Sequence, residues 1–130
     1  MCGRFALTSD GSSLCEHFRV TLSTPIKPRF NIAPSQKLLI IRLQSETKKH
    51  TSSLVRWGLI PSWAKDQSIG TRLTNARSET ALTKPSFRDS FRRRRCLIPA
   101  TGFYEWTTSG KRKQPYYVRL TSNEPFGIGG

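Results

Sequence analysis

Hydrophobic residues in this chain occur in short runs that have the alternation or the continuous apolar character of β-strands. The clearest run is residues 37–43, Lys-Leu-Leu-Ile-Ile-Arg-Leu, and the alternating residues 53–57 are its expected hairpin partner across a polar turn at 44–52. We expect the other strands at residues 3–7, 96–100, 103–107, 115–121 and 126–130.

Helical signals are few and short. Ser13-Leu14-Cys15-Glu16 matches a capping box, which predicts a helix over residues 14–19. Phe87 and Phe91 lie four residues apart and favour a second helix over 86–93. Proline-containing segments predict loops at 21–36 and 58–72, and Ser109-Gly110-Lys111 predicts a turn. The fold class expected is therefore α+β, a mostly antiparallel β sheet or barrel with short helices.

Composition narrows the class of protein. The 130 residues (14.8 kDa) suit a single domain, 1–130. They contain 35% hydrophobic and 10% aromatic residues, which is too many for a disordered basic tail. No run approaches the roughly 20 apolar residues of a membrane span, and the N-terminus lacks the apolar region of a signal peptide. The 22 Lys and Arg against 8 Asp and Glu give a net charge of +14, which favours a polyanionic partner such as nucleic acid.

The basic residues are densest at Arg92-Arg93-Arg94-Arg95, with Lys84 and Arg88 before them. Such a run has three interpretations: a solvated surface cluster, a nuclear localisation signal, or contact with nucleic acid. Trp63, in a proline-containing loop, is a candidate for stacking on an unpaired base, although packing in the core would explain it equally well.

The three cysteines, Cys2, Cys15 and Cys96, are too few and too widely spaced for a disulfide framework or a zinc site. His17 and His50 have no metal-ligand spacing, so no metal or other cofactor is expected. We expect reduced thiols in a reducing compartment, with Cys15 a small core residue and Cys96 buried in a strand.

Cys2 follows the initiator Met1, which is normally removed before a small residue. The mature chain would then begin with an α-amine and a thiol on adjacent carbons. The unperturbed pKa values of these groups, about 8 and about 8.5, leave useful fractions of neutral amine and thiolate at neutral pH. An amine attacks an aldehyde to give an imine, and the tethered sulfur closes a thiazolidine ring. A second use is catalysis by a cysteine nucleophile with a histidine base. Position alone favours a third interpretation, a buried small residue at the start of a strand.

Five short motifs occur along the chain, and their order resembles that of a known protein family. They are Met1-Cys2-Gly3-Arg4-Phe5, Phe30-Asn31-Ile32-Ala33-Pro34, Arg56-Trp57-Gly58-Leu59-Ile60-Pro61, Thr74-Asn75-Ala76-Arg77-Ser78-Glu79-Thr80 and Gly102-Phe103-Tyr104-Glu105-Trp106. Each motif alone is weak, but together they span residues 2–106 and resemble the SRAP (SOS response-associated peptidase) family.

The resemblance implies a function. It implies binding of single-stranded or junction DNA that contains an abasic site, and a stable thiazolidine cross-link between Cys2 and the ring-opened deoxyribose aldehyde. An associated lyase activity and reversal of the cross-link are also implied, as part of the DNA damage response. The partner would be DNA and not a membrane, the protein a monomer, and its location the cytoplasm or nucleoid, or the nucleus in a eukaryote.

The resemblance also assigns roles to residues of this chain. Cys2 is the nucleophile, Asn75 hydrogen-bonds near the reacting sugar, and Glu105 transfers protons during ring opening and imine formation. The positions that match DNA contacts are Arg4, Asn31, Pro34, Trp63 and Arg77, with Arg4 and Arg77 on phosphates. Arginine suits that contact because its planar fork matches a phosphate. Lys84 is a further candidate DNA contact because of its charge near the arginine run.

The family pattern continues past residue 130, with further strands and a catalytic histidine that neither His17 nor His50 matches. The resemblance therefore implies that the chain is the N-terminal part of an SRAP-like domain. Two alternatives remain open: a cysteine-type peptidase that acts on itself, and a basic single-stranded DNA-binding module without chemistry.

Overall fold

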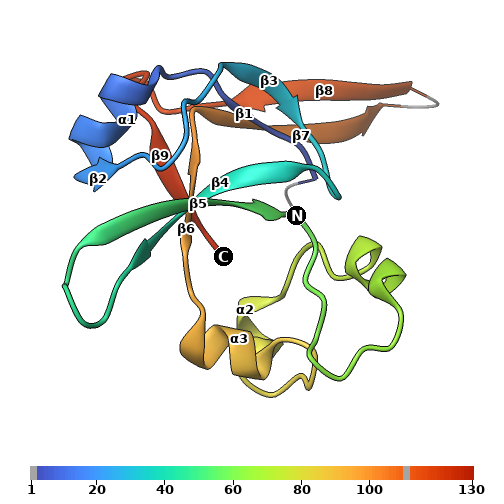
Figure 1. The fold of residues 1–130 in the computed structure, drawn as a ribbon. Helices are drawn as coiled ribbons and strands as arrows, with labels where there is room; N and C mark the ends of the chain where they lie inside the picture. The colour runs from blue at the N-terminus through green and yellow to red at the C-terminus, as the bar shows by residue number, and fades with distance from the viewer. Residues whose placement is uncertain (1–2, 110–111) are drawn as a thin grey trace.

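The computed structural model describes residues 3–109 and 112–130, which form two β-sheets and several short helices (Figure 1). The four-stranded sheet has the order β3-β1-β7-β8, with β1 Phe5–Leu7, β3 Arg29–Ile32, β7 Gly102–Ser109 and β8 Arg112–Val118. The five-stranded sheet has the order β2-β5-β4-β6-β9, with β2 Val20–Thr21, β4 Lys37–Leu43, β5 His50–Arg56, β6 Leu97–Ala100 and β9 Phe126–Gly129. All pairings are antiparallel except β2 with β5, so the predicted α+β fold with mostly antiparallel sheet is confirmed.

Strand β4 lies at the centre of the five-stranded sheet. Its residues 38–41 are four consecutive apolar residues and each is at most 5% exposed. Continuous burial means that both faces of this strand are covered, which explains why its sequence does not alternate. It pairs with β5 from Lys37↔Arg56 to Leu43↔His50, so the predicted hairpin is confirmed and β5 begins three residues earlier than expected.

The core joins the two sheets. Phe5 and Leu7 of β1, Leu14 of the first helix, Ile32 of β3 and Leu38 of β4 belong to one buried cluster. All three residues of β1 are buried, so this strand is anchored in the core.

The first helix, α1, spans Gly11–Phe18 and not residues 14–19. Asp10 is its N-cap and accepts a hydrogen bond from the Ser13 backbone N–H at 2.9 Å. The predicted capping box at Ser13 is therefore wrong, because the carboxylate three residues upstream already satisfies that N–H. Hydrogen bonds from the Ser12 and Ser13 side chains and from the Ser13 backbone hold the pKa of Asp10 well below its usual range.

Three further short helices lie between β5 and β6: η1 Gln67–Thr71, α2 Ser78–Ala81 and α3 Arg88–Arg93. They form a lobe, called here the helical lobe (residues 58–95), on one side of the β4–β5 hairpin (Figure 1). The predicted helix over 86–93 is confirmed as α3, two residues shorter. Helices η1 and α2 were not expected, since four or five residues are too few to show a periodicity.

The predicted loop over 21–36 contains β3, and β8 begins three residues earlier and ends three residues earlier than expected. Residues 110 and 111 of the predicted turn lie outside the described residues. Cys15 is only half-buried, and Cys96 is half-buried one residue before β6, so neither is the fully buried residue that we expected. Among the described residues, no helix is long and apolar enough to cross a membrane.

Candidate functional site

The N-terminal end of β1 is where the predicted site residues gather. Cys2 lies outside the described residues, and Gly3 and Arg4 lead from it into β1. In the four-stranded sheet β1 lies between β3, which carries Asn31, and β7, which carries Glu105. Strand β1 therefore lies between two strands that each supply a predicted functional residue.

The register of β1 with β7 defines the neighbours of the first described residues. Phe5 lies opposite Phe103, and the Tyr104 N–H donates to the Arg4 carbonyl at 2.9 Å. Continued by one residue, this register brings Gly3 opposite Glu105. Glu105 itself is half-buried and lies opposite Tyr116 of β8.

Arg4 is fixed on the other side of β1. Its Nη1 donates to Asn31 Oδ1 at 2.9 Å, and both side chains are exposed. The hydrogen bond crosses from β1 to β3 and orients the guanidinium beside the chain start. One face of the site thus presents a fixed positive charge and an amide to solvent.

The segment that contains Asn75 is connected to the N-terminal end of β1 through Trp57. The Trp57 ring packs against Phe5 with centroids 5.5 Å apart, and its Nε1 donates to the Thr74 carbonyl at 2.7 Å. Asn75 follows directly, is half-buried, and its Nδ2 donates to Thr74 Oγ1 at 3.4 Å. Trp57 therefore links the Asn75 segment to β1 by one ring contact and one hydrogen bond.

A close contact between two glycines supports this arrangement. Gly58 has a φ of +128° and its carbonyl side packs against Gly70, while the Leu59 N–H donates to the Leu73 carbonyl at 2.9 Å. A side chain at position 58 would overlap the Gly70 carbonyl oxygen. Both glycines are needed so that the segment after β5 can lie against the segment that leads to Thr74.

The other predicted DNA-contact residues lie further out. Pro34 is half-buried in a turn whose Ser35 N–H donates to the Trp57 carbonyl at 2.9 Å, so it belongs to the same cluster. Arg77 is exposed at the start of α2, two residues after Asn75. Trp63, 57% exposed, and Lys84 lie in the helical lobe, and within the described part of the chain neither hydrogen-bonds to β1.

Two residues that position the site were not identified from the sequence as doing so. Trp57 holds the Asn75 segment, and the Tyr104 hydroxyl donates to the Phe30 carbonyl at 2.9 Å, next to Asn31. Both occur in the motifs quoted above, but their partners come from distant parts of the chain. For Tyr104 the available signal was its position next to Glu105, and for Trp57 it was only its place within a motif.

The two histidines lie away from this site. The His50 Nδ1 is 2.8 Å from the Phe18 carbonyl oxygen, and the ring of His17 packs against that of Phe18. His50 begins β5, whereas Trp57 follows the other end of that strand. Within residues 3–109 and 112–130, no group of His, Cys, Asp and Glu side chains could hold a metal ion.

Cys96 differs chemically from an N-terminal cysteine. Burial raises the pKa of its thiol, and the nearby Arg42 charge only partly offsets this effect. A raised pKa lowers the thiolate fraction at neutral pH, so Cys96 is a poor nucleophile.

Comparison with known proteins identifies relatives along the whole chain. The model of the family described as "SOS response associated peptidase (SRAP)" matches residues 1–130. The chain is 42% identical to the abasic site processing protein YoqW of Bacillus subtilis, over 100% of this chain and 59% of that protein. It is 32% identical to the abasic site processing protein YedK of Escherichia coli, over 96% of this chain and 56% of that protein.

Similarity extends to a vertebrate protein and to solved structures. The chain is 34% identical to the abasic site processing protein HMCES of Gallus gallus, over 75% of this chain and 32% of that protein. A crystal structure of a protein from Bacteroides thetaiotaomicron has the same fold, with a TM-score of 0.84 at 23% identity over 98% of this chain and 58% of that one. The chain thus spans less than two thirds of the length of these relatives.

Proposed function

Because this chain belongs to the SRAP family, we propose that it binds single-stranded or junction DNA and forms a covalent cross-link with an abasic site through Cys2. Three relatives carry the name abasic site processing protein. The observation that carries the proposal is the position of β1, whose N-terminal end runs between the strands of Asn31 and Glu105 and is linked through Trp57 to the Asn75 segment.

The proposed reaction begins with removal of Met1, which frees the Cys2 amine. The amine attacks C1′ of the ring-opened deoxyribose, and loss of one water gives an imine. The Cys2 thiolate then adds to the same carbon, the imine nitrogen takes up a proton, and a five-membered thiazolidine closes. Overall the protein and the aldehyde combine with loss of one water, and no oxidant or metal is required.

The described residues suit distinct parts of this reaction. Glu105, half-buried beside the chain start, would hand protons to and from the sugar oxygens and the leaving water. Asn75 offers both a donor and an acceptor to the sugar hydroxyl. Arg4, oriented by Asn31, and Arg77 would hold the phosphates that flank the lesion.

The remaining predicted contacts fit a path for the DNA strand over the outer surface. Trp63 presents an exposed ring on which an unpaired base could stack, and Lys84 adds a positive charge in the same helical lobe. Pro34 and Asn31 border the strand end from the β3 side. The proposed contacts therefore suit the bases and phosphates of DNA and not a peptide.

The test is a denaturing gel of the protein incubated with a single-stranded oligonucleotide that contains one abasic site. We expect a slow-migrating, heat-stable band that disappears in Cys2→Ala and also when Met1 is retained. The matched control is Cys15→Ala, which removes a half-buried thiol far along the chain and should leave the band unchanged.

Two outcomes would overturn the proposal. Binding of DNA without any adduct, unchanged in Cys2→Ala, would indicate a basic DNA-binding module. Cleavage of a peptide by the protein that is lost in Cys2→Ala, again without an adduct, would indicate a cysteine peptidase.

A further inference from the structure

The end of the β4–β5 hairpin and the segment after α3 together form a basic hollow. Its volume is about 440 Å³, and it is lined by Arg42, Leu43, Gln44, Thr51, Arg93, Arg94 and Arg95. We call it the four-arginine hollow. No acidic residue is among these lining residues, and the polar groups besides the arginines are an amide and a hydroxyl, which can donate hydrogen bonds.

The convergence of four arginines results from the fold. Helix α3 ends at Arg93, and Arg94 leaves the helical conformation with φ −133° and ψ 31°. The chain then enters β6, which pairs with β4 at Ile41↔Leu97. This pairing brings Arg42 beside the end of the arginine run, more than fifty positions along the chain.

Helix stabilisation accounts for only part of this cluster. Arg92 and Arg93 lie in the last turn of α3, where a positive charge interacts favourably with the helix dipole. Arg94 and Arg95 lie beyond that turn, and Arg42 belongs to a different element. Converging like charges destabilise a fold unless an anion neutralises them.

Carboxylates do not neutralise the hollow. Among the described residues, an ion pair joins Arg88 and Asp89 at 3.8 Å, and neither residue lines the hollow. Glu46 contacts one lining residue, since its carboxylate accepts from Gln44 Nε2 at 3.3 Å, but it forms no ion pair with the arginines among the described residues. Four guanidinium groups are thus available to an external anion, and their geometry suits the oxygens of a phosphate.

The hollow lies at the opposite end of the β4–β5 hairpin from the candidate site. Trp57 follows the last residue of β5, whereas Thr51 is at its beginning. Six residues of extended strand span about 20 Å. Duplex DNA has one phosphate per strand about every 3.4 Å along its axis, so the length of β5 alone corresponds to roughly six nucleotide steps.

We propose that the four-arginine hollow binds backbone phosphates of the same DNA, on a duplex arm that flanks the abasic site. This inference rests on the proposed function, because it takes the lesion to lie at the N-terminal end of β1. The hollow would hold the arm without sequence preference, since phosphates carry none. It would thereby favour junctions over isolated single strands.

The test compares binding of two DNAs that carry a stable abasic analogue without an aldehyde, so that no cross-link forms. One is a short single strand with about two nucleotides on each side of the lesion, and the other adds a duplex arm of about ten base pairs on either side. The proteins are the unaltered chain, Arg93→Gln/Arg94→Gln/Arg95→Gln, and the single variant Arg42→Gln. The exposed arginines make no described ion pair, so these variants should fold normally.

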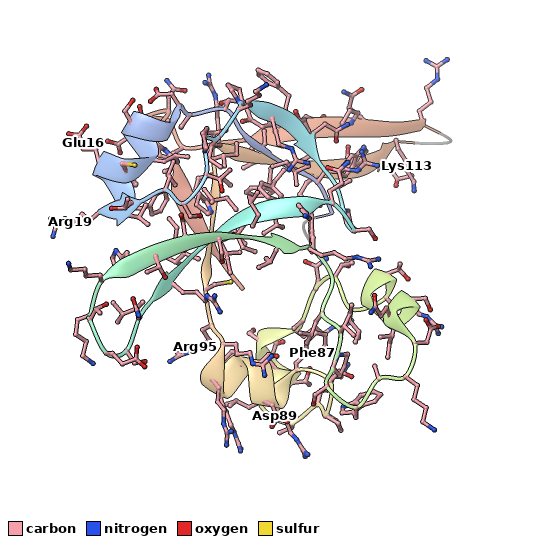
Figure 2. All side chains as sticks on the ribbon, viewed as in Figure 1. Glu16, Arg19, Phe87, Asp89, Arg95 and Lys113 are labelled. Carbon is pink, nitrogen blue, oxygen red and sulfur yellow. The ribbon has the colours of Figure 1, made fainter. Side chains whose placement is uncertain are left out.

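The matched control is Arg112→Gln/Lys113→Gln/Arg119→Gln, which removes the same charge from exposed residues of β8 and the segment after it. Figure 2 shows Lys113 on the β7–β8 hairpin, across the molecule from Arg95 beside α3. We expect the hollow variants to lose most of the affinity that the duplex arm adds. The slope of the logarithm of the binding constant against the logarithm of salt concentration should fall in magnitude by about 1 to 2. The control should keep the gain.

Three results would overturn the inference. The hollow variants could keep the affinity added by the duplex arm, or the control variant could lose as much of that affinity as they do. The third result is that the hollow binds only inorganic phosphate. In the last case phosphate would raise the melting temperature of the unaltered chain but not of the hollow variants, while the arm gain persists in both. Failure of the proposed function is distinguishable, because the adduct with a short abasic aldehyde strand does not require the hollow. That adduct should form to the same extent in all of these proteins.

Discussion

At the scale of single residues, Phe5 matters because it anchors the N-terminal end of β1, next to the residues of the candidate site. Phe5 is 2% exposed and packs against Trp57 with centroids 5.5 Å apart. Arg4 is held on one side by Asn31 and on the other by the backbone of Tyr104. These contacts fix Arg4 and Phe5, the described residues that lead toward the proposed nucleophile.

Trp57→Phe tests whether the Asn75 segment depends on the indole N–H. The ring contact with Phe5 is kept, but the Thr74 carbonyl loses its 2.7 Å donor. We expect the free energy of unfolding to fall by about 1 kcal/mol and the cross-link to form more slowly. Denaturant titration and timed gels measure the two effects.

The control for that variant is Trp63→Phe, at an exposed ring. It should change the free energy of unfolding by less than about 0.5 kcal/mol. Equal loss of stability in the two variants would show that the Trp57–Thr74 hydrogen bond does not hold this segment.

At the scale of elements, the site depends on contacts between segments that are far apart in sequence. Strand β1 has only three residues, yet it pairs with β3 and β7 on its two sides. The Asn75 segment is connected to the end of β5 through the close approach of Gly58 and Gly70. Substitutions at these contacts should therefore alter the structure at the N-terminal end of β1.

Gly58→Ala is the most direct perturbation of the contact between Gly58 and Gly70. The residue has a φ of +128°, and a Cβ would overlap the Gly70 carbonyl oxygen. We expect a loss of about 1–3 kcal/mol in the free energy of unfolding, together with slower cross-linking. Gly129→Ala is the control, since a Cβ there has no atom within 4 Å. Unchanged stability of Gly58→Ala would contradict the described packing.

The N-cap of α1 gives a prediction about pH. Because the pKa of Asp10 is lowered in the folded chain, its ionised form stabilises the fold at pH values above the unfolded pKa, about 3.9. That stabilisation is lost as the pH falls through the lower, folded pKa. Asp10→Ala should therefore lower the melting temperature at pH 7, and the difference from the unaltered chain should shrink progressively below about pH 4. A difference independent of pH would contradict the capping role.

At the scale of the whole molecule, sequence patterns predicted the strands better than the connections. The run at 37–43 corresponds to β4 residue for residue, because continuous burial produces a continuous apolar run. Strand β3 was missed, because only one of its four residues, Arg-Phe-Asn-Ile, is buried and the strand follows two prolines. Helix α1 was placed three residues late, because the sequence pattern favours a cap at Ser13 whereas Asp10 caps the helix in the fold.

The candidate site was predictable as a set of motifs but not as a geometry. The ordered motifs contain Asn31, Asn75 and Glu105, and the structure places the strands of the first and last on either side of β1. The link through Trp57 could not be inferred, since it joins positions seventeen apart by a side-chain to backbone hydrogen bond. The arginine run at 92–95 was a charge pattern in the sequence, and only the β4–β6 pairing brings Arg42 to it.

The central claim is that Cys2 reacts through both its amine and its sulfur. The decisive measurement is the mass of the adduct after exposure to abasic DNA, digestion of the DNA and proteolysis. We expect the modified peptide to begin at Cys2, with Met1 absent, and to carry the sugar with loss of one water and no free thiol. An adduct on a lysine or on Cys15, a Cys2 peptide that keeps its free thiol, or no adduct at all would contradict the claim.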